Sequence, residues 1–283
     1  MKKQMQISFS GGRTSGYMTK LLLDNLSNEY DFIVTFANTG LEHSKTLDFV
    51  NNCDKYFGFN TVWLEADVYH GERKGTSFKI VDYASASRNG EPYEQMIKKY
   101  GIPGVTHPHC TRELKLAPMR SYLKSLNVHH TTIPTAIGIR NDETRRISPQ
   151  AEANNIVYPL IHMWPADKQD VLDWWEDQLF DLDIEEWEGN CRLCFKKSLK
   201  KQFKQLDTDV SIVHWYKKME YLYSSNGSNK EVGFKRAFFR NNLTIDSLVG
   251  LWEQDRKGNP TPTRLNPYED SGCSESCEVY ETV

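Results

Sequence analysis

Short apolar segments alternate with longer amphipathic segments in the first part of the chain. The segments with the composition of buried strands are residues 5–9, 31–40, 60–67 and 131–139. Between the first three lie two segments with one apolar face, residues 15–26 and 44–58, which predict helices. Alternation of this kind predicts parallel βαβ units with helices on both faces of a sheet.

The pattern changes along the rest of the chain. Residues 68–109 contain several Gly and Pro and predict an irregular insertion with one helix near residues 92–99. Residues 111–126 are helical in composition, although Pro118 should break or kink the helix. After Pro165 the pattern is mainly helical, and residues 257–283 are rich in turn residues. We therefore expect an α/β domain at residues 1–165 and a mainly helical region at residues 166–283.

Composition narrows the class of protein. The chain has 283 residues, of which 39% are hydrophobic and 12% aromatic, enough to build a sizeable core. The net charge of −3 argues against a general polyanion binder. Because no apolar run approaches the length of a membrane span and residues 1–6 lack a signal-peptide core, we expect a cytoplasmic protein without membrane contact.

The segment ISFSGGRTSGYM (residues 7–18) joins the first predicted strand to the first predicted helix. Glycines at this point let the backbone approach a ligand closely, and free amides at a helix start attract anions. Ser10, Thr14 and Ser15 add hydroxyl donors. The alternative is an ordinary tight turn with a Ser or Thr cap, but the position after the first strand of an α/β pattern favours phosphate binding.

A second candidate anion site follows the strand predicted at residues 131–139. GIRNDETRR (residues 138–146) contains three arginines, and the guanidinium fork matches phosphate or sulfate oxygens. Ligands of open α/β sheets bind at the carboxyl ends of the strands. The alternative is a solvated charged turn whose ion pairs contribute little.

Six cysteines raise the question of a metal or redox site, since disulfides are not expected without export. Cys191 and Cys194 form a C-x-x-C pair, which is typical of zinc or iron–sulfur ligation. Cys273 and Cys277 form a second pair near the end of the chain, suited to redox chemistry or to anchoring the tail. Cys53 lies alone in a predicted helix and is interpreted as a plain thiol, either buried or on the helix surface.

Two further patterns have structural alternatives that we prefer. A basic run on one helical face could meet nucleic-acid phosphates, but the nearby acidic segment 173–188 favours a solvated or self-paired surface. The run consists of Lys196, Lys197, Lys200, Lys201 and Lys204. Trp174, Trp175 and Trp187 are interpreted as core residues rather than stacking platforms.

Together these motifs resemble the phosphoadenosine phosphosulfate (PAPS) reductase-like family of the PP-loop, or adenine nucleotide α-hydrolase, superfamily, in its phage and bacterial form. SFSGGRTS resembles the PP-loop, and four later segments occur in the family's order. They are NTGLEHSKTLDFV, HCTRELKLAPMRSYL, GIRNDETRR and YPLIHMWPADKQDVLDWW. The match covers about residues 5–194. The resemblance implies a Rossmann-like, doubly wound, mostly parallel sheet.

The resemblance also assigns site residues. Those expected to hold an adenine nucleotide with Mg²⁺ are Ser10, Gly11, Gly12, Arg13, Thr14, Ser15, Asn38, Thr39, Gly40, Gly138, Arg140, Glu143 and Arg146. Ser10, Thr14 and Arg140 would take part in catalysis, and Glu143 would hold one guanidinium in position. Cys110, Cys191 and Cys194 would bind a [4Fe-4S] cluster or Zn²⁺, with the fourth ligand open among His107, His109, Cys273 and Cys277.

Three functions follow as expectations. The first is adenylation, in which ATP is converted to AMP and pyrophosphate to activate a small-molecule or nucleobase acceptor, with sulfur transfer as one outcome. The second is sulfonucleotide reduction, in which Cys277 or Cys273 attacks sulfur, sulfite is released and a thioredoxin-like partner supplies electrons. The third is a nucleotide-sensing or nucleic-acid-binding module without turnover. A homodimer is compatible with all three, and the intact SGG loop favours the first.

Overall fold

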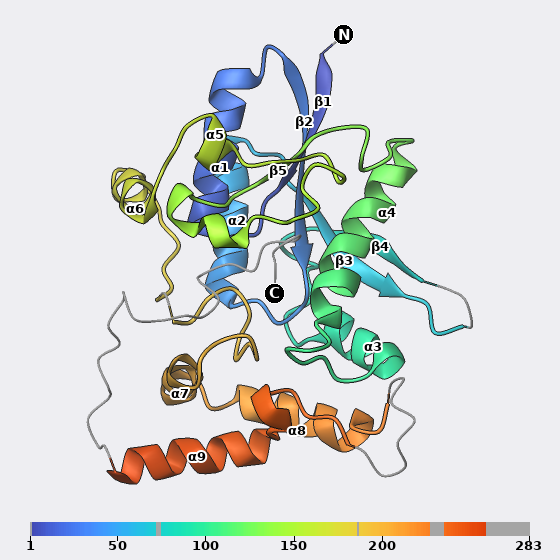
Figure 1. Cartoon of the computed structure of the whole chain (residues 1–283), viewed down its shortest axis with the longest axis vertical. Helices are drawn as coiled ribbons and strands as arrows, with labels where there is room; N and C mark the ends of the chain where they lie inside the picture. The colour runs from blue at the N-terminus through green and yellow to red at the C-terminus, as the bar shows by residue number, and fades with distance from the viewer. Residues whose placement is uncertain (1, 72–74, 186, 227–234, 259–283) are drawn as a thin grey trace.

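The structure is a computed structural model that describes all residues except 1, 72–74, 186, 227–234 and 259–283. Within the described residues six strands form one sheet with the order β4-β3-β2-β1-β5-β6 (Figure 1). Neighbouring strands are parallel except β3 and β4, which are antiparallel. This confirms the predicted Rossmann-like, mostly parallel α/β sheet. The strands are β1 (Lys3–Ser8), β2 (Tyr30–Asn38), β3 (Val62–Val68), β4 (Thr76–Val81), β5 (Thr135–Ile137) and β6 (Ile156–Val157).

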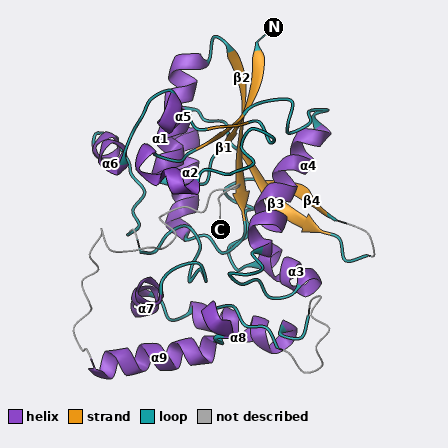
Figure 2. Ribbon diagram, viewed as in Figure 1, coloured by secondary structure: helices purple, strands orange, loops and turns teal. Residues whose placement is uncertain are grey.

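Helices cover both faces of the sheet, and more helices follow it (Figure 2). Residues of α1, α2 and α6 share one hydrophobic core with β1 and β2, whereas α4 packs on the opposite face. Helices α7, α8 and α9 lie below the sheet in this view, which agrees with the predicted helical C-terminal part. The helices are α1 (Arg13–Leu26), α2 (Ser44–Phe57), α3 (Glu91–Tyr100), α4 (Ala117–Ser125), α5 (Pro159–His162), α6 (Lys168–Glu176), α7 (Leu199–Thr208), α8 (Ile212–Tyr223) and α9 (Ile245–Gly258).

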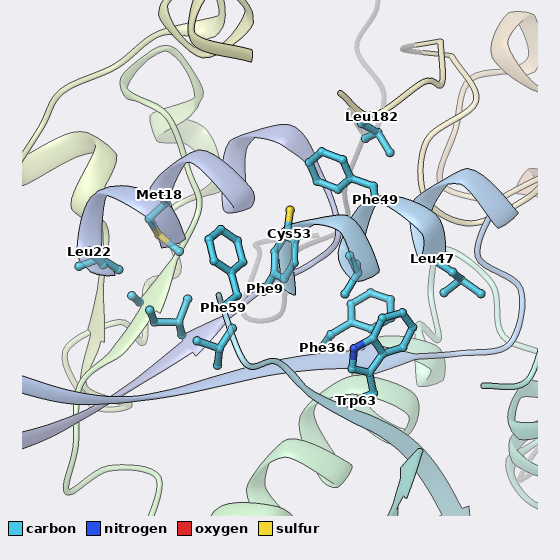
Figure 3. Packing of buried hydrophobic residues seen from close by; sticks show 14 of the residues in the cluster. Phe9, Met18, Leu22, Phe36, Leu47, Phe49, Cys53, Phe59, Trp63 and Leu182 are labelled. Atoms are coloured by element: carbon cyan, nitrogen blue, oxygen red, sulfur yellow. The ribbon is translucent and has the colours of Figure 1, made fainter. Parts of the chain in front are cut away.

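The core between α1, α2 and the sheet is rich in aromatic side chains (Figure 3). Phe9 packs edge-on against Phe59, with ring centroids 5.5 Å apart, and also contacts Phe49 at 6.3 Å. Cys53 lies among these rings with no exposed surface. Burial raises the pKa of its thiol well above the ordinary value, with a smaller contribution from the charge of Asp54. Of the two expected positions for this thiol, the structure shows the buried one.

Strand β1 is buried on both faces, which explains its composition. Met5 and Ile7 enter the hydrophobic core, while the alternating Gln6 points to the other face and is also buried. The Gln6 amide donates to Thr35 Oγ1 at 3.1 Å and accepts from Thr135 Oγ1 at 3.2 Å. Because polar groups on both neighbouring strands satisfy it, a polar residue is tolerated at the centre of the sheet.

Several predicted elements differ from the structure. The segment 68–109 is not merely irregular around one helix, because it contains β4, an antiparallel edge strand. The strand predicted at residues 131–139 is limited to Thr135–Ile137, and β6 was not predicted. Pro118 does not end the helical run, and it lies where the hydrogen-bonding pattern changes to that of α4. A π-helix, Thr111–Leu116, leads directly into it.

The helical segment after the sheet packs closely on it. Trp175 of α6 is 1% exposed and belongs to the same core as α1, and its indole Nε1 donates to the Arg13 carbonyl at 2.9 Å. The domain boundary at residue 165 stays a prediction. Among the residues that the structure describes, no helix is both long and apolar enough to cross a membrane.

Candidate functional site

Two loops meet where the strand order reverses. Strands β1, β2 and β3 follow one another across the sheet, and the chain then crosses to place β5 on the other side of β1. Since β1 and β5 are parallel, the loops that follow them leave from the same edge of the sheet. This is the switch point at which open α/β sheets bind ligands. The loops are residues 9–12 and 138–140.

The loop after β1 has the backbone of an anion-binding turn. Gly11 has φ +79°, and a Cβ there would lie 2.8 Å from Thr46 Cγ2, so only glycine fits. Gly12 is the N-cap of α1, and no side chain caps the helix. The first turn carries no acidic residue. Its amides therefore keep the partial positive charge that favours phosphate.

The hydroxyl groups of the loop are organised around one serine. Ser15 Oγ lies 2.8 Å from Ser10 Oγ, accepts from the Ser10 amide at 3.2 Å and donates to the Gly12 carbonyl at 3.0 Å. Ser15 is fully buried, so it fixes the loop from within, whereas Ser10 is only half-buried. Ser15 therefore shapes the loop, whereas Ser10 offers a hydroxyl group at its surface.

Arg13 points to a different partner from the one that the sequence suggested. Its Nε and Nη2 bind the Asp181 carboxylate at 2.7 and 2.8 Å, and Nη2 also contacts the Leu182 carbonyl. This fork-to-fork geometry ties the start of α1 to the segment after α6. In the structure the guanidinium of Arg13 thus holds two distant segments together, and its predicted contact with a nucleotide stays a prediction.

Arg140 brings the second anion segment to the first. Its Nη1 donates to Thr14 Oγ1 at 3.2 Å, across 126 residues of sequence, and its Nε lies 2.9 Å from Asp142 Oδ1. Glu143 Oε1 lies 2.7 Å from Arg146 Nη1 and 3.4 Å from Arg140 Nη2. The carboxylate therefore contacts both guanidinium groups, which is the arrangement expected of a residue that positions them. The side chains of Arg140 and Arg146 are only 12% and 14% exposed.

Glycine at position 138 lets these two segments approach. A Cβ on Gly138 would lie 2.8 Å from the Ser15 Cα, so any larger residue would push β5 away from α1. The role of Gly138 in the structure is therefore close packing of the strand end against the phosphate loop.

Asn38, Thr39 and Gly40 lie at the carboxyl end of β2 and are fully buried. The Asn38 amide donates to Glu65 Oε1 at 2.7 Å, and both the amide and the hydroxyl of Thr39 donate to the Glu42 carboxylate. Their polar groups are thus engaged within the protein, and their predicted contact with the adenosine stays a prediction.

The C-x-x-C turn packs directly against this edge of the sheet. The Asn190 carbonyl accepts from the His43 amide at 2.7 Å, and the Arg192 amide donates to the Leu41 carbonyl at 3.0 Å. Asn190 Nδ2 donates to the Ser10 carbonyl at 2.6 Å. Asn190 was not predicted as a site residue, because a single Asn before a cysteine carries no motif.

The three predicted ligand cysteines lie in one region. Burial raises the pKa of the Tyr93 phenol well above its ordinary value, and the charges of Cys110, Cys194 and Cys191 add to this. The Tyr216 pKa is raised well above its ordinary value by burial and by the same three cysteines. The Tyr216 hydroxyl donates to the Leu193 carbonyl at 2.9 Å. Tyr93 and Tyr216 therefore both lie within electrostatic range of the three cysteines, and convergence of these cysteines on one site stays a prediction.

A metal centre requires ligand side chains in a suitable arrangement, beyond cysteines in the same region. Among the described residues, no group of three or more His, Cys, Asp or Glu side chains has the arrangement of metal ligands. A [4Fe-4S] cluster or Zn²⁺ at these cysteines stays a prediction, and no chemistry below is routed through a bound metal centre. Cys273 and Cys277, including the predicted catalytic role of Cys277, lie outside the described residues.

Part of the basic run is buried rather than solvated. Lys197 and Lys201 are 2% and 3% exposed. The interpretation of a solvated surface is therefore wrong for these two residues. The Ser198 side chain caps α7 by accepting from the Lys201 amide at 3.4 Å. The prediction that Trp175 is a core residue is confirmed.

The sheet and its loops define an α/β protein in which the loops after β1 and β5 meet at the switch point. The chain belongs to the family of the nin region protein ORF290 of Escherichia phage lambda, with 30% identity over 279 residues, 97% of this chain and 94% of that protein. No family model matches the chain.

More distant similarities cover part of the chain. Protein MJ0066 of Methanocaldococcus jannaschii is 25% identical over 167 residues, which are 58% of this chain and 29% of that protein. Protein MJ0973 of the same organism is 27% identical over 169 residues, 59% of this chain and 32% of that protein. A solved structure of phosphoadenylyl-sulfate (PAPS) reductase from Candida auris, a phosphate complex, has a TM-score of 0.38 and 16% identity. It covers 61% of this chain and 71% of the reductase chain.

Proposed function

We propose that the chain is a PP-loop enzyme that binds ATP, or a related adenine nucleotide, at residues 10–15 and transfers the adenylate group to an acceptor. One observation carries the proposal. The Arg140 guanidinium lies 3.2 Å from the Thr14 hydroxyl, so two anion-binding segments from distant parts of the sequence face one position. The order of PP-loop motifs in the sequence supports the same assignment.

The division of roles follows from the geometry. The uncapped amides of α1 and the Ser10 hydroxyl would hold the β- and γ-phosphates of MgATP. Arg140, positioned by Asp142 and Glu143, would face the remaining phosphate oxygens. An acceptor oxygen would form a bond to the α-phosphorus while the bond from that phosphorus to the bridging oxygen breaks. Pyrophosphate would leave with the bonding electrons, stabilised by the same amides and guanidinium.

The adenylated acceptor is then activated for displacement. A sulfur or nitrogen nucleophile would attack the acceptor carbon, and AMP would leave with the oxygen that the acceptor supplied. Positioning and charge stabilisation are the contributions of the protein to such a reaction, and they require the rigid loop that Ser15 and Gly11 provide.

The test is to follow the products formed from radiolabelled ATP with Mg²⁺ and, in parallel, from PAPS. Adenylation predicts AMP and pyrophosphate in equal amounts, and Gly12→Val should abolish them. Gly12 has φ −103° and ψ 161°, which any residue can adopt, so the substitution blocks ligand approach without backbone strain. Gly75→Val is the matched control, because nothing lies within 4 Å of a Cβ there.

Other outcomes separate the alternatives. Sulfite release from PAPS would support a sulfonucleotide reductase in place of an adenylating enzyme. Tight ATP binding without products, under a range of acceptors, would favour a nucleotide-sensing module. Failure of ATP to bind would remove the proposal altogether.

A further inference from the structure

A cavity of about 550 Å³ lies away from the phosphate loop, between the loop after α3 and the loop before α9. Figure 1 shows α3 beside α8 in the lower part of the molecule, where these two loops meet. None of residues 10–15 or 138–146 lines the cavity. Its volume is in the range of small-molecule sites, about 300–1,000 Å³.

The polar lining of the cavity has one sign of charge. Arg236, Arg240 and His107 contribute the ionisable side chains, and no Asp or Glu is among the described lining residues. The whole chain has a net charge of −3, so a cavity without carboxylates does not follow from composition. A concave site lined by one sign of charge concentrates ions of the opposite sign.

Further basic side chains lie just behind the lining. The His109 ring lies near the His107 ring, with centroids 6.1 Å apart. The neighbouring Arg112 guanidinium is paired with the Glu113 carboxylate at 2.6 Å, so the positive charge available to a ligand is that of the lining residues Arg236 and Arg240.

One guanidinium in the cavity wall has an unused donor. Arg236 Nη1 is buried and has no hydrogen-bond partner among the described residues. A buried donor without a partner destabilises the folded protein unless a ligand supplies an acceptor. Gly101, at φ +85°, lets the chain lie close to the Asn226 backbone, since a Cβ there would lie 2.4 Å from the Asn226 carbonyl oxygen and 3.2 Å from Arg236 Nη1. Arg236 Nη1 thus lies against the chain at Gly101.

The loop that carries Arg236 also contains a tight, strained turn. Asn241 and Asn242 both have positive φ, 59° and 56°. The Asn242 side chain holds the loop by accepting from the Ala237 amide at 2.8 Å and donating to the Lys235 carbonyl at 3.0 Å. Two left-handed residues in succession cost free energy, and strain of this kind concentrates at ligand sites. The loop turns Arg240 and Asn241 toward the cavity.

We propose that this cavity binds the phosphate group of a nucleotide, either free or within a nucleic-acid strand. Arg236 and Arg240 bind the phosphate oxygens, and Asn241 offers amide groups to the remainder of the ligand. The site goes beyond the proposed adenylation chemistry, because it uses no residue of the phosphate loop. It is a second ligand site on the side of the molecule that carries Cys110.

The test uses fluorescence anisotropy with a short fluorescein-labelled single-stranded oligonucleotide, and unlabelled nucleoside monophosphates as competitors. Arg240→Ala and Arg236→Ala should each weaken binding at least tenfold. Arg240 is exposed, so its substitution tests the site even if the Arg236 variant does not fold. Lys124→Ala removes the same charge from the exposed end of α4 and should leave binding unchanged.

Competition between the oligonucleotide and the monophosphates distinguishes the two sources of phosphate. Displacement of the oligonucleotide by a monophosphate at similar concentration identifies a free nucleotide as sufficient, and absence of displacement identifies a strand. Either of these two results supports the proposal that the cavity binds phosphate. Absence of binding by both probes, or wild-type affinity in the Arg240 variant, overturns it. Gly12→Val should retain this binding while it loses ATP at the phosphate loop, so the two proposals fail independently.

Discussion

At the scale of single residues, Arg140 connects the two halves of the candidate site. Its guanidinium reaches Thr14 on α1 and Asp142 on its own turn, and it is largely buried. A hydrogen bond to a charged group contributes about 1.5–3 kcal/mol. We therefore expect Arg140→Ala to weaken ATP binding roughly tenfold to a hundredfold.

Titration calorimetry with ATP and Mg²⁺ measures this change directly. Lys124→Ala serves again as the charge-matched control, because that lysine is exposed and distant in sequence from both loops. An unchanged dissociation constant in a folded Arg140→Ala protein would return residues 138–146 to the role of a solvated charged turn.

Glu42 is a second residue with a measurable consequence. Burial raises the pKa of its carboxyl group above the ordinary value of 4.5, and the Lys115 charge and the Thr39 hydrogen bonds offset only part of this. The folded protein therefore keeps the proton at pH values where the unfolded chain has lost it. The stabilisation that the protonated Glu42 carboxyl contributes is fully present below its pKa in the unfolded chain. It is lost as pH rises through the raised pKa of this group in the folded protein.

The Glu42→Gln variant does not lose stability in this way as pH rises, because its side-chain amide does not titrate. Urea unfolding at a series of pH values starting below 4.5 should show a wild-type free energy that falls relative to the variant as pH rises. Two curves that stay parallel over this range, or that diverge in the opposite direction, would contradict a raised pKa at this position.

At the scale of elements, two helical glycines have opposite surroundings. A Cβ on Gly16 of α1 would lie 2.8 Å from Trp175 Cζ2, whereas nothing lies within 4 Å of a Cβ on Gly250 of α9. Alanine is favoured over glycine in a helix by roughly 0.5–1 kcal/mol. Overpacking a core costs about 1–3 kcal/mol. Gly250→Ala should therefore stabilise the protein and Gly16→Ala should destabilise it.

The measurement is the free energy of unfolding of both variants in urea under identical conditions. The gain in helix propensity from Gly to Ala is nearly the same at the two sites. The difference between the free energies of unfolding of the two variants therefore reports the contact between α1 and α6. A shift of both variants in the same direction would mean that α6 does not pack on α1 as the structure shows.

Secondary-structure elements were predictable from the sequence where the local pattern and the packing agree. They were not predictable where tertiary contacts determine the local structure. Strands β1, β2 and β3 and their helices are long and periodic, and Gly58 ends α2 with φ 67°, as its position predicted. Strand β4 was missed because it is a half-exposed antiparallel edge without a continuous apolar run. Strand β6 has two residues, too few for any periodicity.

The candidate site shows the same limit. The glycines and serines of the loop after β1 carry a motif, so their place was predictable from sequence. The contact of Asn190 with Ser10 and the binding of Arg13 by Asp181 join segments 180 and 168 residues apart, which no local pattern encodes. The burial of Lys197 and Lys201 likewise depends on how α7 packs against the rest of the fold.

At the scale of the whole molecule, the candidate site is held by segments from across the chain. Residues 10–15 contact the β5 end at Gly138, the 140–146 turn through Arg140, and the C-x-x-C segment through Asn190. A ligand seated among them stabilises all of these contacts together. Binding should therefore appear as greater resistance of the entire fold to heat, and not only as a local change.

Ligand linkage gives the expected size. At a free ATP concentration one hundred times the dissociation constant, a ligand that binds only the folded state adds about 2.7 kcal/mol. For a chain of this size such a gain raises the Tm by several degrees, on the order of 5–10 °C. We expect this rise with MgATP in the wild type and in Gly75→Val, and none in Gly12→Val. Circular dichroism melting of the three proteins, with and without MgATP, measures it. If Gly12→Val melts in the absence of nucleotide at the wild-type temperature and still gains the full increment, the nucleotide binds elsewhere on the molecule.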